Sequence, residues 1–176
     1  MRRRSGSYDG LHDTAAHRAR KIFRDTFAAG ISLFGVADLE SLARDTHKFE
    51  ARYLDRLVGP YPAMAERYRQ RSPVHYLDEV TCPVLVLQGL DDRVVPPAQA
   101  EAIVAALAAN RVPHAYLAFE GEGHGFRGSV AIRRAIAARL AFLGTVFGFE
   151  PADELEPLEV PGMAEWRDRR HPTLTT

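Results

Sequence analysis

The sequence lacks the features that disulfide scaffolds, membrane spans and charge-driven binding proteins require. A single cysteine, Cys82, excludes an internal disulfide and fits a reducing compartment. No apolar run approaches the roughly 20 residues that cross a bilayer. Basic and acidic side chains number 23 each, so no overall field attracts the chain to nucleic acid or to an anionic membrane. We therefore expect neither nucleic acid nor a membrane as a partner.

The remaining composition is that of one globular domain. The chain has 176 residues, of which 46% are hydrophobic and 26% charged, enough to bury a core. Its basic start at residues 1–4 has no apolar region behind it, which argues against a secretory signal and for a cytoplasmic protein. We expect a polar N-terminal segment at 1–10, read as a turn or frayed end, a domain at 11–150 and a loosely ordered tail at 151–176.

Two apolar runs, each followed by a polar loop, organise the domain. The run 83–88 reads as a buried strand and is followed by Asp91 and Asp92, and the run 114–119 is followed by the glycine-flanked His124. An alanine-rich helical segment begins at Pro97 and separates the two runs. Strands joined in this way are parallel and have their carboxyl ends at one edge of the sheet. Asp92 and His124 are therefore expected to meet at that edge.

The other periodic segments predict one more strand and several helices. The apolar run 27–36, bounded by glycine, is typical of a strand, and we expect a packed thiol at Cys82. The helical patterns lie at 11–25, 37–59, 64–71 and 130–147. The inward-facing stripes are expected at Leu39, Leu42, Phe49, Tyr53, Leu54 and Leu57, at Ile103, Val104 and Leu107, and at Ile132, Ile136, Leu140, Leu143 and Phe147.

A carboxylate and a histidine at the same sheet edge form half of a nucleophilic triad. Asp92 would accept the Nδ1–H of His124 and stabilise the imidazolium, while Nε2 takes a proton from a hydroxyl nucleophile. Glycines at 121, 123 and 125 let the histidine loop turn sharply and let a substrate approach the ring.

The segments 72–75, 82–99 and 120–126 closely resemble the carboxyl-terminal half of the catalytic domain of the prolyl oligopeptidase family, especially its dipeptidyl and acylaminoacyl peptidases. The resemblance extends over roughly residues 23–153. It implies a partial α/β-hydrolase fold with three predominantly parallel strands, flanking helices and missing upstream strands. It also implies that Asp92 is the triad acid and His124 the triad base, and that Asp91 is a loop carboxylate.

The nucleophile of such a fold lies on a Gly-x-Ser-x-Gly turn between a strand and a helix. The family order of serine, aspartate and histidine leaves one candidate, Ser7. Ser5 and Asp9 occupy the two glycine positions, and residues 1–4 do not have the composition of a buried strand. Family members also have upstream strands, an oxyanion donor from that region and often a β-propeller. The resemblance therefore implies a truncated form with a degenerate or missing elbow.

Three functions remain open. The first is a serine-type peptidase that acts on peptides through Asp92, His124 and a serine, which is either Ser7 or one supplied by missing sequence, and that needs no cofactor or metal. The second is a catalytically inactive remnant that at most associates with another chain, and the third is an esterase of the same fold. Unpaired strand edges favour self-association. Trp166 would pack either on a partner or back onto the domain.

Overall fold

The structure, a computed structural model, describes residues 4–9, 27–45 and 53–170. The helix expected at 11–25 lies outside these residues. The described elements, in chain order, are β1 (Arg4–Asp9), β2 (Phe27–Leu33), α2 (Leu39–Asp45), α3 (Tyr53–Leu57), α4 (Ala65–Arg71), the 3₁₀ helix η1 (Pro73–Glu79), β3 (Val84–Gly89), α5 (Pro97–Ala109), β4 (His114–Phe119), α6 (Ser129–Phe147) and α7 (Met163–Arg170).

The strands form one four-stranded sheet in the order β1-β2-β3-β4, and all its pairs are parallel. The three strands expected from the sequence are β2, β3 and β4, and their parallel pairing is confirmed. The fourth strand, β1, was not expected from the sequence. Residues 4–9 pair with β2 in a strand, where the sequence indicated a turn or frayed end, because backbone pairing with β2 needs no apolar side chains.

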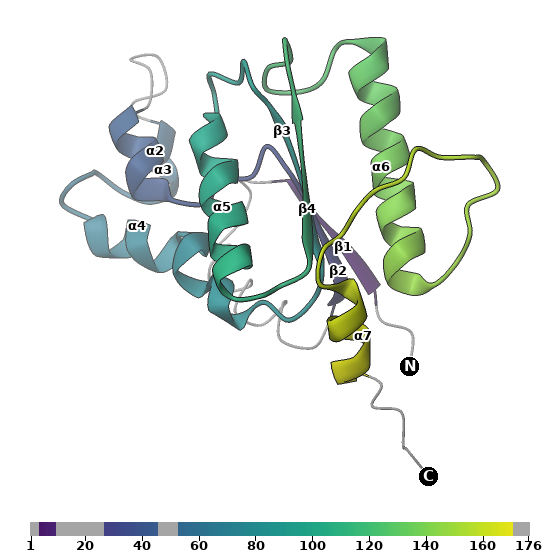
Figure 1. The fold of residues 1–176 in the computed structure, drawn as a ribbon. Coiled ribbons are helices and arrows are strands. Elements are labelled where there is room, and N and C mark those ends of the chain that lie inside the picture. The colour runs from purple at the N-terminus through teal and green to yellow at the C-terminus, as the bar shows by residue number, and fades with distance from the viewer. Residues whose placement is uncertain (1–3, 10–26, 46–52, 171–176) are drawn as a thin grey trace.

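Helices cover both faces of the sheet, as its apolar composition requires (Figure 1). The alternation of β3 divides the core: Val84 and Val86 pack with residues of α5 on one face, and Leu85 and Leu87 pack with residues of α6 on the other. Cys82, just before β3, is fully buried, as expected of a packed thiol.

Helix α6 faces the sheet with a different stripe from the one that the sequence predicted. Its buried residues include Ala131, Ala135, Ala138 and Phe142. The predicted stripe is largely exposed instead, at Ile132, Ile136, Leu140 and Phe147, and of the five only Leu143 packs against the core. Alanines let the helix approach the sheet closely, and only one face of the helix can do so.

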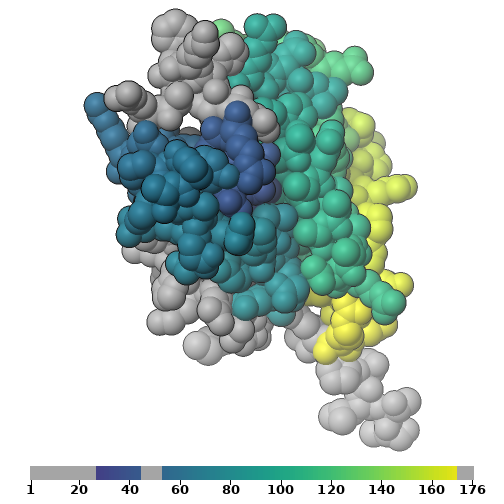
Figure 2. All heavy atoms as spheres, turned by 90° about the vertical axis from the view of Figure 1, so that its left-hand side faces the viewer, coloured from purple at the N-terminus to yellow at the C-terminus, as the bar shows by residue number. Residues whose placement is uncertain are grey.

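Helices α2, α3 and α4 lie outside α5, and Figure 2 shows them forming a continuous surface with it. From the stripe expected over 37–59, Leu42 and Leu54 are buried, but Tyr53 and Leu57 are 44% and 40% exposed. Phe49 lies outside the described residues. In α5 the expected Ile103 and Leu107 are buried and Val104 packs against the same core, as predicted.

The C-terminal segment, expected to be loosely ordered, contains the docked helix α7. Met163 and Trp166 are 7% and 8% exposed, and Trp166 Nε1 donates a hydrogen bond of 2.7 Å to the carbonyl of Thr81. Trp166 therefore packs back onto the domain, at the amino ends of the strands. Within the described residues, no helix has the length and apolar content that crossing a bilayer requires.

Candidate active site

Two loops meet at the carboxyl edge of the sheet. The acid loop, residues 90–96, follows β3, and the histidine loop, residues 120–128, follows β4. Backbone hydrogen bonds join the acid loop to the end of β4 and to the histidine loop: Leu90 N donates to the carbonyl of Phe119, the last residue of β4, and Asp91 N donates to Glu122 O, both at 2.9 Å. The two loops therefore form one backbone unit rather than two independent surface loops.

Gly89 permits this close contact between the loops. A Cβ at this position would lie 2.4 Å from the carbonyl oxygen of Glu122 and 2.6 Å from that of Gly123. Both atoms belong to the backbone and cannot rotate away, so only glycine fits where β3 ends.

The carboxylate of Asp92 is held by four hydrogen bonds. Its Oδ1 accepts from the backbone N–H groups of Val94 at 2.9 Å and Val95 at 2.8 Å. Its Oδ2 lies 3.2 Å from Gln88 Nε2 and 3.0 Å from His124 Nδ1. The side chain is fully shielded from solvent. These donors satisfy a buried charge that would otherwise be costly.

His124 extends from the histidine loop to this carboxylate, and its side chain is 37% exposed. Its ring also contacts that of Phe34, with centroids 5.2 Å apart, and Phe34 in turn contacts Phe126 at 4.8 Å. Because an ionised carboxylate only accepts hydrogen bonds, Nδ1 carries the proton and Nε2 is left as the basic nitrogen. The ring is thus oriented for proton transfer at Nε2.

Glu122 fixes the shape of the histidine loop. Its carboxylate accepts from the backbone N–H groups of Arg127 at 2.6 Å and Gly128 at 2.9 Å, directly before α6. An acidic group at the start of a helix is also favoured by the helix dipole. Asp91, by contrast, is exposed, and only its backbone N–H bonds to the histidine loop, as expected of a loop carboxylate.

Ser7 lies inside β1, where its backbone pairs with Ile31 of β2. Ile31 pairs in turn with Leu85, the second residue of β3. The structure therefore places Ser7 within a strand, two residues before the end of β1 at Asp9, and not on a turn beyond it. The structure thus brings Asp92 and His124 together and does not place Ser7 on an elbow.

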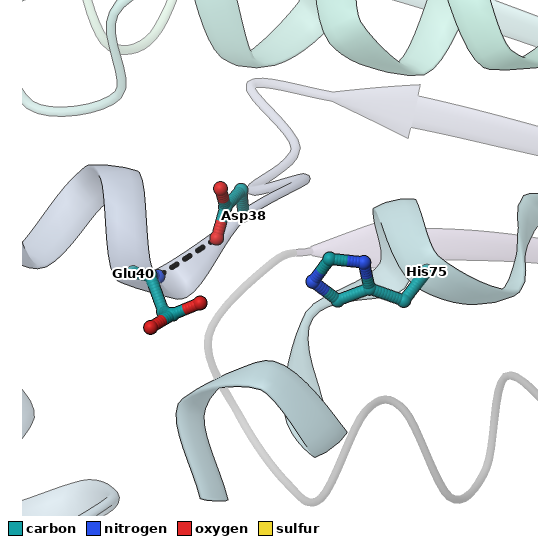
Figure 3. A group of neighbouring side chains, drawn as sticks. All are labelled: Asp38, Glu40 and His75. Atoms are coloured by element: carbon teal, nitrogen blue, oxygen red, sulfur yellow. Dashed lines mark hydrogen bonds between the residues drawn. The ribbon is translucent and has the colours of Figure 1, made fainter. Parts of the chain in front are cut away.

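A second cluster of ligand-type side chains lies beside α2, where Asp38, Glu40 and His75 have donor atoms within 4.8 Å of one another. Figure 3 shows the His75 ring extending from η1 toward the two carboxylates. Protein groups already engage both acids. Asp38 Oδ1 accepts from Glu40 N at 2.8 Å, and Glu40 pairs with Arg69 at 3.2 Å. Helix capping and an ion pair explain this cluster.

Sequence reasoning missed Gln88, Phe34 and Glu122 as parts of the site. Gln88 had a readable signal, because it is the one polar side chain at the end of an otherwise apolar strand. Phe34 and Glu122 had none, since an aromatic residue after a strand and an acid in a loop are common.

The model of the prolyl oligopeptidase family matches residues 7–150. The chain is 32% identical over 128 residues to dipeptidyl peptidase family member 6 of Caenorhabditis elegans, covering 69% of this chain and 17% of the relative. It is 29% identical over 125 residues to esterase LipQ of Mycobacterium tuberculosis, covering 68% of this chain and 30% of the relative.

Among solved structures, a puromycin-hydrolyzing peptidase of Mycobacterium tuberculosis superposes with a TM-score of 0.78 at 42% identity, covering 89% of this chain and 23% of that one. The chain thus spans less than a third of the length of each of these relatives. The parallel sheet with its flanking helices is a partial α/β-hydrolase fold. The match over residues 7–150 shows that the chain belongs to the prolyl oligopeptidase family.

Proposed function

We propose that the chain carries the acid and base of a serine-type peptidase. The observation that carries this proposal is the 3.0 Å hydrogen bond between His124 Nδ1 and the buried Oδ2 of Asp92, at the edge where two strands end. If Asp92 and His124 were only an exposed pair in two loops, the carboxylate would not need to accept four hydrogen bonds. A buried acid that holds a base in one tautomer does need them.

In the proposed reaction, His124 acts first as base and then as acid. Nε2 removes the proton of a serine hydroxyl as its oxygen attacks the peptide carbonyl, and the carboxylate of Asp92 stabilises the imidazolium. The imidazolium then gives that proton to the leaving amine, and the acyl-enzyme forms. Water, deprotonated at the same nitrogen, releases the acid product and restores the serine hydroxyl.

Ser7 is the proposed nucleophile of the described chain. Two observations support it: Ser7 precedes Asp92 and His124, as the family order requires, and β1 belongs to the same parallel sheet as β3 and β4. For attack, the Ser7 hydroxyl must approach His124 Nε2. The position of Ser7 inside β1 supports the competing proposal of a catalytically inactive remnant.

A peptide or aminoacyl amide is the proposed substrate class. The dipeptidyl peptidase and the puromycin-hydrolyzing peptidase are named for the cleavage of such bonds. An esterase is the second candidate, favoured by the similarity to esterase LipQ. Both reactions use the same acid and base, and they differ in the leaving group that His124 must protonate.

Labelling with a fluorophosphonate probe tests these proposals on the purified chain. We expect an adduct in the unmodified protein and none in Ser7→Ala or His124→Ala. Turnover of matched peptide and ester substrates then separates a peptidase from an esterase. A folded sample that takes up no probe would support the inactive remnant and overturn the proposed function.

A further inference from the structure

Gln88 is an anomaly in the core of the sheet. It is 0% exposed, and it follows the apolar residues 84–87 of β3. A glutamine there gives up the hydration of its amide and gains less apolar packing than leucine or methionine would. Some other interaction must account for a polar side chain at this position.

The hydrogen bonds of Gln88 lie on one side of its amide. Nε2 lies 3.0 Å from the carbonyl of Val95, 3.1 Å from that of Gly89 and 3.2 Å from Asp92 Oδ2. Oε1 is buried and has no partner among the described residues. A buried carbonyl without a hydrogen-bond donor costs free energy, so packing alone does not explain a glutamine at this position.

We propose that Gln88 is a positioning residue for the acid of the triad, an inference that rests on the proposed function. Two backbone N–H groups already hold Oδ1 of Asp92. Gln88 supplies the only side-chain donor to Oδ2 besides His124 among the described residues. It fixes the rotation of the carboxylate so that Oδ2 faces the imidazole, and it satisfies part of the charge on that oxygen.

A purely structural role makes a different prediction. Gln88 bonds to Gly89 O, directly before the acid loop, and to Val95 O, near the end of that loop; if the role is purely structural, losing these bonds would only lower the free energy of unfolding. A positioning role requires in addition that replacing Gln88 change the chemical shift and the solvent exchange of the proton between His124 and Asp92. The test must therefore observe that proton in the folded protein.

The measurement is proton NMR of the chain with ¹⁵N-labelled histidine, following the Nδ1–H of His124 and its exchange with solvent. We expect a low-field signal in the unmodified protein, and in Gln88→Met a changed shift with exchange on the order of tenfold faster. The matched control is Gln99→Met. Gln99 is also buried, and its Oε1 accepts two hydrogen bonds, from the backbone N–H groups of Ala37 and Asp38.

Gln88→Glu provides a second variant that keeps the size of the side chain. Its protonated carboxyl donates to Asp92 and is expected to restore the signal at acidic pH. Once ionised, it places two like charges at hydrogen-bond distance, and the signal should be lost as the pH rises. A circular dichroism spectrum that stays the same over this pH range separates the loss of the signal from unfolding.

Three results would overturn the inference: no such signal in the unmodified protein, an unchanged signal in folded Gln88→Met, or the same change in Gln99→Met. Should Gln88→Met not fold, the pH series of Gln88→Glu decides, and a signal independent of pH counts against the inference. The NMR readout needs neither a nucleophile nor a substrate. A folded chain that takes up no fluorophosphonate probe but shows a signal that depends on Gln88 would therefore refute the proposed function and leave the positioning role of Gln88 intact.

Discussion

Asp91 and Asp92 show how neighbouring residues of one type take opposite roles. Asp91 is exposed, whereas Asp92 is 3% exposed and accepts four hydrogen bonds. The difference arises from the turn after β3, which directs one side chain to solvent and the other beneath the loop. The role of an aspartate therefore depends on the hydrogen-bond donors around its carboxylate and not on its residue type alone.

Gly89→Ala tests the close contact between the two loops. The added methyl group meets two backbone carbonyl oxygens, and we expect a loss of about 1–3 kcal/mol in the free energy of unfolding. Urea denaturation followed by circular dichroism measures it. The control is Gly123→Ala, whose nearest neighbour is Asp91 O at 3.8 Å. Equal stability of the two variants would contradict the contact.

Tyr68, which is buried, and Tyr116, which is partly buried, are expected to respond in opposite directions to loss of the hydroxyl. The Tyr116 hydroxyl has no partner among the described residues, so Tyr116→Phe should raise the free energy of unfolding by about 1 kcal/mol. Tyr68 donates to Gly59 O at 2.8 Å, so Tyr68→Phe should lower it by a similar amount. A destabilised Tyr116→Phe in urea denaturation would show that its hydroxyl is bonded.

The same tyrosines predict a loss of stability in alkali. Burial raises the pKa of both Tyr68 and Tyr116 above the ordinary value of 10.0. The unfolded chain therefore ionises first, and the free energy of unfolding should decrease as the pH rises above 10. Urea denaturation at several alkaline pH values measures the slope. An alkaline slope in the unmodified protein that is no steeper than the slope in Tyr68→Phe and Tyr116→Phe would contradict the burial of these groups.

At the scale of elements, α6 shows why periodicity alone chose the wrong face. The helix carries two apolar stripes, one of alanines with Phe142 and one that contains Ile132, Ile136 and Leu140. Large aliphatic residues favour the second stripe in any sequence pattern. The sheet selects the first, because small side chains allow the backbone of the helix to come closer.

Substitutions on the two faces of α6 should differ sharply in cost. Phe142 is fully buried, and Phe142→Ala should cost about 3–5 kcal/mol. Ile136 is 51% exposed, and Ile136→Gln should change stability by less than about 0.5 kcal/mol. Thermal and urea unfolding of both variants measure this. A large loss in Ile136→Gln at a concentration where the chain is monomeric would contradict the exposure of this stripe.

At the scale of the whole molecule, the sequence predicted the parallel order of β2, β3 and β4 and the meeting of their following loops, because buried strands and polar loop residues leave strong patterns. It did not predict β1, whose residues are largely polar and whose pairing depends on the backbone. The docking of α7 was equally hidden, since it depends on a contact between Trp166 and the distant Thr81.

Self-association is the prediction that belongs to this scale. Within the described residues, β1 pairs on one side only, and α6 exposes an apolar stripe. Both features favour contact with a second chain. Sedimentation velocity over a range of concentrations should show a shift toward larger species. A monodisperse monomer with one sharp unfolding transition would contradict this expectation.

The catalytic role proposed for Asp92 and His124 is tested most directly by the rate of fluorophosphonate labelling in two neighbouring variants. Asp92→Asn should slow labelling by several orders of magnitude, up to about 10⁴-fold, because the imidazole loses its tautomer and its counter-charge. Asp91→Asn, which alters an exposed carboxylate one position away, should label at the rate of the unmodified chain. Equal rates in the two variants, or no labelling of the folded chain, would contradict the role assigned to this pair.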